Sequence, residues 1–356
     1  MKIFIRSTAS ISAQETFGAV PFLVNPVNKT GDYFKAIEPS YTNILDPKLN
    51  RRMSRIIRMG VAAAISCLRE AGIEKPGAII TGTAYGCLED TGIFLSRIIE
   101  QEEQALSPTA FIQSTHNTIG AQVALMLGCN EYNNTFVHKG FSFETALLDS
   151  MMLLQEGDAK NVLVGAADEV TNFSHTILKR FSLYKKDGLD DDPDFQSQSA
   201  GTAAGEGAAF FLLSVEPSAN DYAQLNGLLT FYKPGSAAAI IKNIGDFILS
   251  QSINISDIDL VITGRNSDRK HDCIYDELEQ KLFNNTMLID YKYLCGEYPT
   301  AVSFAMWLAA KILKAGQLPP DVGLNNIKKI KTILIYNSYL DNYHSLILMS
   351  AVNNPD

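Results

Sequence analysis

The sequence predicts an α/β fold made of two related halves. Near-continuous apolar strands, such as the one at 161–167, lie next to a helix at 141–155 that is apolar on almost every face. That combination is typical of a parallel sheet that is covered on both sides. The order of strands and helices recurs in the second part of the chain. We therefore expect two α/β halves that are joined near residues 216–223.

Apolar periodicity places the elements of the first half between polar or proline-rich loops. Alternating residues at 1–13 indicate a strand, and the four prolines between 21 and 47 mark a loop-rich stretch. A single apolar face that ends at Ala71-Gly72 predicts the helix at 52–72. The expected strands are 1–13, 78–83, 134–140, 161–167 and 208–215, and the expected helices are 52–72, 89–103, 118–127 and 141–155.

The second half follows the same rules. An apolar helix contains the only tryptophan, Trp307, and two apolar runs near the C-terminus predict a closing hairpin. The expected strands are 224–232, 259–263, 286–290, 331–336 and 344–349, and the expected helices are 237–250, 275–283 and 300–315.

Composition and charge exclude several classes of protein. The chain has 356 residues, of which 46% are hydrophobic and 19% charged, and its formal net charge is −9. These values describe a globular chain with a large core. The acidic sum argues against bulk nucleic-acid binding, which needs a broad basic surface. The chain has no unbroken apolar run of about 18 residues, so we expect no membrane span. Its first residues are typical of a strand rather than a signal peptide.

The cysteines and glycines indicate no cofactor. Five cysteines are scattered through the chain without a CxxC pair, so we expect neither a disulfide framework nor a zinc site, and a cytoplasmic location. No glycine-rich stretch has the GxGxxG or GxxxxGK spacing of a nucleotide site. An aspartate run at 190–194 lacks the spacing of a calcium loop, and we interpret it as part of a solvated loop.

An ordered set of short segments resembles the β-ketoacyl synthases of the thiolase-fold superfamily. The segments are Arg52-Met53-Ser54, residues 108–124, Gly157-Asp158 followed by 162–169, the Gly-Glu-Gly-Ala-Ala block at 205–209, Asp257-Ile258, and Lys292 ahead of Gly296. The resemblance implies a thiolase-like, layered αβαβα architecture with an N-terminal half at 1–218 and a C-terminal half at 219–356. Fold by itself does not carry function.

The resemblance also implies a chemistry, and three residues of this chain depart from it. The family forms a thioester on a cysteine at the start of the buried helix, and two histidines stabilise the negative charge that develops. The matching positions fall on Gly140, Gly264 and Glu297, and the family's lysine is retained as Lys292. Glycine cannot hold an acyl group, and an anionic Glu297 would oppose catalysis.

The family's glycine-rich gating loop is also replaced. It should follow Asn337-Ser338, where this chain has the shorter, glycine-free segment Tyr339 to His344. We expect His138, Phe141, Phe143 and His344 to line an acyl tunnel or the site beside it. Whether Lys292 and Glu297 form an ion pair is left open by the sequence.

Two other residues are alternative nucleophiles. Cys295 lies two residues before Glu297, although a buried cysteine more often serves as a small apolar residue. Ser142 lies just after Gly140, and strand alternation would place His138 on the same face as Gly140. A helix-capping serine next to a hydrogen-bonded histidine is the more frequent arrangement.

A group of arginines is a candidate dock for an acidic acyl carrier protein. Arg51, Arg55 and Arg58 recur at i, i+4 and i+7, so a helix would carry them on one face. The alternative is a solvated face with carboxylate partners inside the same chain.

Taken together, the sequence predicts a β-ketoacyl synthase-like protein without the Cys-His-His set. Its expected role is a non-catalytic, chain-length-factor-type subunit of an active ketosynthase in fatty acid, polyketide or polyene pigment biosynthesis. Family members pair through the strand before the nucleophile turn, here about 134–137. The alternatives are an active acyl-thioester condensing enzyme with an unusual nucleophile and a homodimeric acyl-binding protein.

Overall fold

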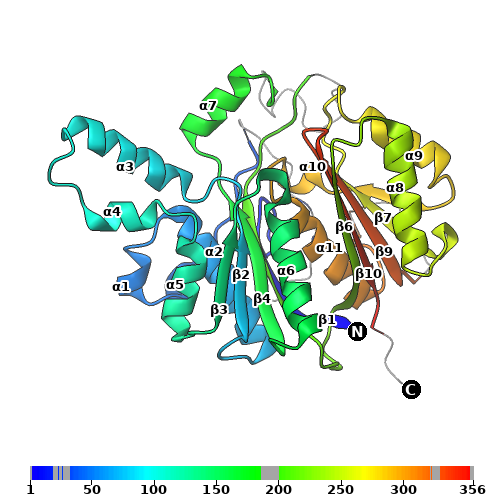
Figure 1. The fold of residues 1–356 in the computed structure, drawn as a ribbon, viewed down its shortest axis with the longest axis horizontal. Coiled ribbons are helices and arrows are strands. Elements are labelled where there is room, and N and C mark those ends of the chain that lie inside the picture. The colour runs from blue at the N-terminus through cyan, green and yellow to red at the C-terminus, as the bar shows by residue number, and fades with distance from the viewer. Residues whose placement is uncertain are drawn as a thin grey trace.

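A computed structural model describes residues 2–18, 23, 26, 33–185, 200–320, 322 and 329–352. Its strands form one ten-stranded sheet in the order β3-β2-β4-β5-β1-β6-β10-β9-β7-β8 (Figure 1). The strands are β1 (Ile3–Ile11), β2 (Ala78–Gly82), β3 (Tyr132–Phe136), β4 (Asn161–Asp168), β5 (Gly207–Ser214), β6 (Ala223–Tyr232), β7 (Leu260–Thr263), β8 (Met287–Asp290), β9 (Thr332–Tyr339) and β10 (Tyr343–Ser350).

The two halves of the sheet have the same topology. In the first half β2 runs parallel to β3 and β4, while β5 runs antiparallel to β4 and β1. In the second half β7 runs parallel to β8 and β9, while β10 runs antiparallel to β9 and β6. The halves meet where β1 pairs antiparallel with β6. This shared order is what two related halves would produce, and the division at 218 and 219 stays a prediction.

Helices cover both faces of the sheet and lie between its halves. They are α1 (Pro47–Asn50), α2 (Arg55–Ala71), α3 (Leu88–Glu100), α4 (Pro108–Gln113), α5 (Thr118–Leu127), α6 (Ser142–Glu156), α7 (Asn172–Arg180), α8 (Ala237–Ser250), α9 (Cys273–Lys281), α10 (Lys292–Cys295) and α11 (Val302–Ala315). Apolar residues of α6 and α11 share one central core with strands of both halves. A second core joins α2 and α5 to the first half, and a third joins α8 and α9 to the second half. The mixed α/β fold that the sequence predicts is confirmed.

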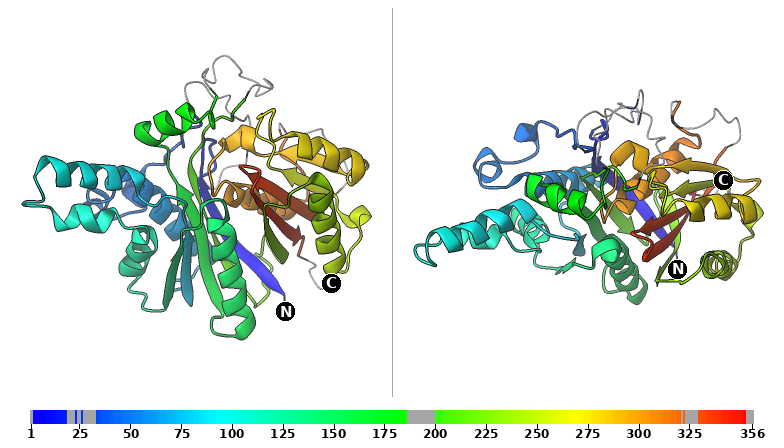
Figure 2. Two further views of the ribbon diagram at one scale, coloured as in Figure 1. Left: turned by 45° about the horizontal axis from the view of Figure 1, so that its top comes forward. Right: turned by 90° about the horizontal axis from the view of Figure 1, so that it is seen from above.

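Helices α3 and α4 have no buried residue, a property they share only with the four-residue helix α1 among the described α-helices. Both views of Figure 2 show them extending from the body as an arm. The rings of Phe94 and Phe111 hold the two helices together at 5.6 Å. Ile99 on α3 is 79% exposed, so the arm presents apolar side chains to solvent.

Two predicted boundaries are wrong near the expected site. The helix that was predicted from residue 52 begins at Arg55, because Ser54 has extended backbone angles and serves as its N-cap. The strand that was predicted to reach Gly140 ends at Phe136, and residues Lys139–Phe141 form a 3-10 turn. His138 and Gly140 therefore do not share a strand face.

A third difference is a helix that the sequence did not indicate. Thr171 and Ser174 form a reciprocal capping box that begins α7. The aspartate run at 190–194 lies outside the described residues. Among those described, no helix combines the length and hydropathy that crossing a membrane requires.

Candidate functional site

The position that the resemblance assigns to the nucleophile is sterically filled. Gly140 lies in the turn between β3 and α6, and it is buried. A Cβ atom added there would lie 2.6 Å from Tyr339 Cδ1 and 3.0 Å from Tyr343 Cβ. Since real Cβ atoms almost never approach that closely, a side chain at this position would have to displace the two tyrosines of the β9–β10 hairpin.

The position that the resemblance assigns to the first histidine is filled in the same way. Gly264 follows β7, and its amide donates a hydrogen bond to the carbonyl of Tyr336 over 2.9 Å. An added Cβ would lie 2.5 Å from Asn337 Oδ1 and 2.9 Å from Tyr275 Oη. Asn337 is itself fixed, because Tyr291 donates a hydrogen bond to its Oδ1 over 2.9 Å.

Lys292 and Glu297 form the ion pair that the sequence left open. Lys292 Nζ lies 2.6 Å from Glu297 Oε2, and the two side chains are 0% and 5% exposed. Lys292 also donates to the carbonyl of Ser338, and Asn266 Nδ2 donates to Glu297 Oε2 over 2.7 Å. The pair neutralises both charges in the interior, where a lone charge would be strongly unfavourable.

The two alternative nucleophiles are held in unreactive settings. Cys295 is 0% exposed, and burial raises the pKa of its thiol well above the ordinary value, which disfavours the thiolate. Ser142 Oγ accepts a hydrogen bond from the amide of His138 and donates one to the carbonyl of Lys139, each over 2.8 Å. These bonds are those of a structural serine at a helix start, and the His138 ring instead lies edge-on to Phe141 at 5.7 Å.

The four expected lining residues do not gather around one space. Phe141 packs against Tyr343 at 5.0 Å, whereas Phe143 packs against Phe211 in the central core. His344 is fully buried, stacks on Phe231 at 5.1 Å and shares a hydrogen bond with Tyr336. Their role at an acyl chain stays a prediction.

The arginines are distributed over two elements. Arg51 is exposed and follows α1, outside the helix that carries Arg55 and Arg58. The predicted single helix face is therefore wrong, because the chain turns before Ser54. Arg55 binds the buried carboxylate of Glu206 at 2.6 Å and that of Glu38 at 2.5 Å.

Arg58 differs from Arg55 because its guanidinium lies 5.7 Å from the centre of the Tyr41 ring. The ion pairs of Arg55 match the alternative in which carboxylates of the same chain satisfy the arginines. Carrier-protein docking stays a prediction, and Arg51 is the one of the three that is most exposed.

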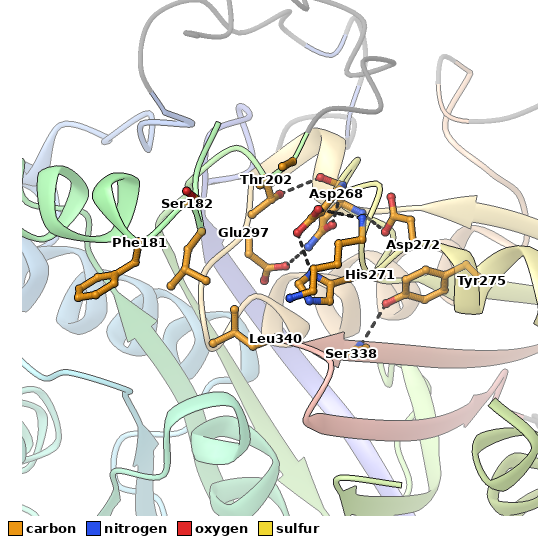
Figure 3. Close-up of a pocket in the computed structure, with 16 residues that line it drawn as sticks. Phe181, Ser182, Thr202, Asp268, His271, Asp272, Tyr275, Glu297, Ser338 and Leu340 are labelled. Carbon is orange, nitrogen blue, oxygen red and sulfur yellow. Dashed lines mark hydrogen bonds and ion pairs between the residues drawn. The ribbon is translucent and has the colours of Figure 1, made fainter. Parts of the chain in front are cut away.

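A pocket opens beside the Lys292–Glu297 pair (Figure 3). It has a volume of about 210 Å³, and Gly264, Asn266, Tyr275, Glu297 and Ser338 are among its lining residues. Its carboxylic acids Asp268 and Asp272 were not predicted to be functional. The sequence does contain a signal for Asp272, because this residue directly precedes α9 and follows the short polar loop after β7.

A buried carboxyl group at Glu144 was also missed. Glu144 lies in the first turn of α6 and is 0% exposed, and neither of its oxygens has a hydrogen-bond partner among the described residues. Burial raises the pKa of this carboxyl to about 7. Within the described part of the chain, no group of three His, Cys, Asp or Glu side chains has the arrangement of a metal site.

Comparison with protein families supports the resemblance over part of the chain. Residues 29–180 match the family model described as the beta-ketoacyl synthase N-terminal domain. This match covers less than half of the sequence. A search of curated proteins found no significant match.

Solved structures with the same fold cover nearly the whole chain. A beta-ketoacyl synthase from Burkholderia phymatum STM815 is 14% identical with a TM-score of 0.82, and the match covers 99% of this chain and 100% of that one. The ishigamide ketosynthase/chain length factor is 15% identical with a TM-score of 0.80, and 99% of each chain is covered.

A third structure has an acyl-carrier protein in its complex. In AntDE:AntF, a type II PKS acyl-carrier protein is bound to its ketosynthase, and the match is 15% identical with a TM-score of 0.75 over 99% of each chain. At these identities the structural matches establish the fold alone. The chain is β-ketoacyl synthase-like, with a thiolase-like fold.

Proposed function

We propose that this chain is a non-catalytic, chain-length-factor-type subunit that pairs with an active ketosynthase. The observation that carries the proposal is the filled space at Gly140, where Tyr339 and Tyr343 occupy the room that a nucleophilic side chain would need. A thioester-forming enzyme needs an accessible nucleophile with a proton-transfer group beside it. The side-chain atoms that crowd Gly140 belong to Tyr339 and Tyr343 of the β9–β10 hairpin.

The surface around β3 supports pairing with a partner. β3 is an edge strand of the sheet, and an exposed edge is a natural template for a strand of another chain. Tyr132, Val137, Leu148 and Met152 are 44%, 46%, 46% and 47% exposed. Tyr132 on β3 donates a hydrogen bond to Asp149 on α6, so the exposed side chains of both elements lie on one face, which we call the β3–α6 face.

The exposed α3–α4 arm adds apolar area that is unusual on an isolated chain. A partner that covers the β3–α6 face would use this subunit as a structural support, and this subunit would catalyse no reaction itself. Its role would be to shape the acyl chamber of the complex, in a fatty acid, polyketide or polyene pigment pathway. A homodimer that binds acyl chains is the alternative that the same face allows.

Co-expression with an active ketosynthase tests the proposal. We expect the two chains to co-purify, and we expect Phe141→Leu or Phe143→Leu in this subunit to change the length of the product. Phe247→Leu is the matched control, since Phe247 is also a buried phenylalanine but lies on α8, in the core that joins α8 and α9 to the second half. Failure to co-purify, together with unchanged product length in both variants, would refute the pairing.

Intact-mass measurement tests the absence of catalysis. After incubation of the purified chain with a short acyl thioester, we expect no mass increase. An acyl adduct on Cys295 or Ser142 would show that this chain is itself an acyltransferase, and the proposal would then be wrong.

A further inference from the structure

The pocket beside the Lys292–Glu297 pair contains a hydrogen-bond acceptor without a donor. Glu297 Oε2 accepts bonds from Lys292 and Asn266, whereas Oε1 has no hydrogen-bond partner among the described residues. Glu297 lines the pocket and its side chain is only 5% exposed. An unsatisfied acceptor at such a buried position is unfavourable unless a ligand or water supplies a hydrogen.

A second carboxyl group lines the same pocket. Asp272 is 9% exposed, and its Oδ1 accepts a hydrogen bond from the amide of Asn266 over 3.1 Å. Asn266 thus contacts both acids, since its side chain bonds Glu297. Burial raises the pKa of Asp272 to about 6, although the charges of Arg265 and Lys292 oppose the rise. Arg265 is paired with Asp276 and Asp290, and Lys292 is paired with Glu297, so neither forms its ion pair with Asp272.

The side chains with donor nitrogens at this pocket are already hydrogen-bonded or lie at its exposed rim. His271 Nδ1 is bonded to Asp268 Oδ2 over 2.7 Å, and Lys292 Nζ is bonded to Glu297. Lys270 is exposed at the pocket, where water screens its charge. The buried side of the pocket therefore presents the hydrogen-bond acceptors of Glu297 and Asp272. An anionic ligand would lie against these two carboxyl groups.

The opposite side of the pocket is apolar. Leu183 and Leu340 line it, whereas the Phe181 ring at its rim points outward and is 73% exposed (Figure 3). The volume of about 210 Å³ has room for a short ligand of several heavy atoms. A ligand that suits these walls has a compact donor group at one end and a short hydrocarbon chain at the other.

We propose that this pocket binds a short-chain primary alkylammonium, with its ammonium group at Glu297 and Asp272 and its hydrocarbon chain against Leu183 and Leu340. An ammonium group carries three donors and a positive charge, so it satisfies Glu297 Oε1 and gives Asp272 an ion-pair partner. This inference goes beyond the proposed function, because it concerns a ligand site within one chain and needs no ketosynthase partner.

The test uses n-propylammonium chloride as the probe and the purified full-length chain. Isothermal titration calorimetry and thermal unfolding are measured with n-propylammonium, sodium propionate and n-propanol at equal concentration and ionic strength. We expect saturable binding in the millimolar range and a higher unfolding temperature with n-propylammonium only. Equal stabilisation by propionate, or no saturable binding of the amine, would overturn the proposal.

Two variants and one control assign the site. Asp272→Asn keeps the acceptor for Asn266 and removes the charge, and we expect the Kd for n-propylammonium to rise at least ten-fold. Glu297→Gln should have the same effect, but it leaves Lys292 unpaired and is interpreted only if its circular dichroism is unchanged. Glu279→Gln is the control, because Glu279 lies on α9 but is exposed and outside the pocket. Wild-type affinity in Asp272→Asn would place the ligand elsewhere and refute the assignment.

Discussion

At the scale of single residues, glycines stand where the β-ketoacyl synthases that this chain resembles have reactive side chains. Neighbouring side chains of this protein fill the space that those reactive groups would occupy. Gly140 faces two tyrosine rings, and Gly264 faces Asn337 and Tyr275. Both glycines therefore belong to a packed interior, and restoring one reactive side chain would not restore a site.

Gly140→Cys is expected to destabilise the fold by about 1–3 kcal/mol, the usual penalty for overpacking a well-packed region. The reason is the 2.6 Å approach of the new Cβ to the Tyr339 ring. Urea unfolding measures the loss. Gly245→Ala is the control, because a Cβ there meets nothing within 4 Å and the helix interior should gain about 1 kcal/mol. A Gly140→Cys variant as stable as the wild type would show that the hairpin yields easily.

Glu144 predicts a dependence of stability on pH. Its folded pKa of about 7 lies above the ordinary value of 4.5, so the folded chain keeps a proton that the unfolded chain releases between these values. Stability due to this group is complete below pH 4.5 and falls until about pH 7, by roughly 3 kcal/mol in total.

Glu144→Gln removes this titration. We expect the variant to match the wild type near pH 4.5 and to exceed its stability by roughly 3 kcal/mol at pH 8. Urea unfolding at the two pH values measures the difference. Glu169 and Asp272, whose pKa values burial also raises, remain in both proteins and cancel in the comparison. If the free energy of unfolding changed equally with pH in the variant and the wild type, Glu144 would be hydrated in solution.

At the scale of elements, apolar periodicity was sufficient to place the long, buried segments. Helices α5 (118–127) and α8 (237–250) lie where periodicity put them. The errors lie where local backbone geometry or local side-chain bonds decide the outcome, as at the extended backbone of Ser54 and at the capping box of Thr171. The sequence also could not show that Tyr339 and Tyr343 cover Gly140, because that contact joins residues about 200 positions apart.

The same limit applies to the pocket. The pairing of Lys292 with Glu297 was conceivable from their short separation, and the structure shows it. Asp272 and Phe181 come from different halves of the chain, and only the fold brings them to one cavity. Spacing along a sequence identifies local pairs and misses such distant ones.

The β9–β10 hairpin offers a test at this scale. Leu340 and Asp341 have φ angles of +53° and +55°, the pattern of a type I′ turn that favours asparagine and glycine. A leucine in this region is strained by about 1–2 kcal/mol. Leu340→Asn should therefore raise the free energy of unfolding by about 1 kcal/mol, measured in urea. A loss of stability instead would show that the apolar contact of Leu340 outweighs the strain.

At the scale of the whole molecule, the two ends of the sheet differ. β3 at one edge, and α6 on β2 and β4 of the same half, present several half-exposed apolar residues, and the α3–α4 arm extends from that half (Figure 1). Helices α8 and α9 cover the second half at the other end of the molecule. We therefore expect a partner to bind at the β3 edge of the sheet, where an open strand edge has apolar surroundings.

The double variant Leu148→Lys/Met152→Lys tests this asymmetry. The two residues are one helical turn apart on α6, so the variant places two charges on the β3–α6 face without entering the core. Burying those charges in an interface should prevent co-purification with the ketosynthase. Leu249→Lys is the matched control, because Leu249 is 68% exposed on α8 at the other end of the sheet. If the double variant still co-purifies while its circular dichroism equals that of the wild type, the partner binds another face.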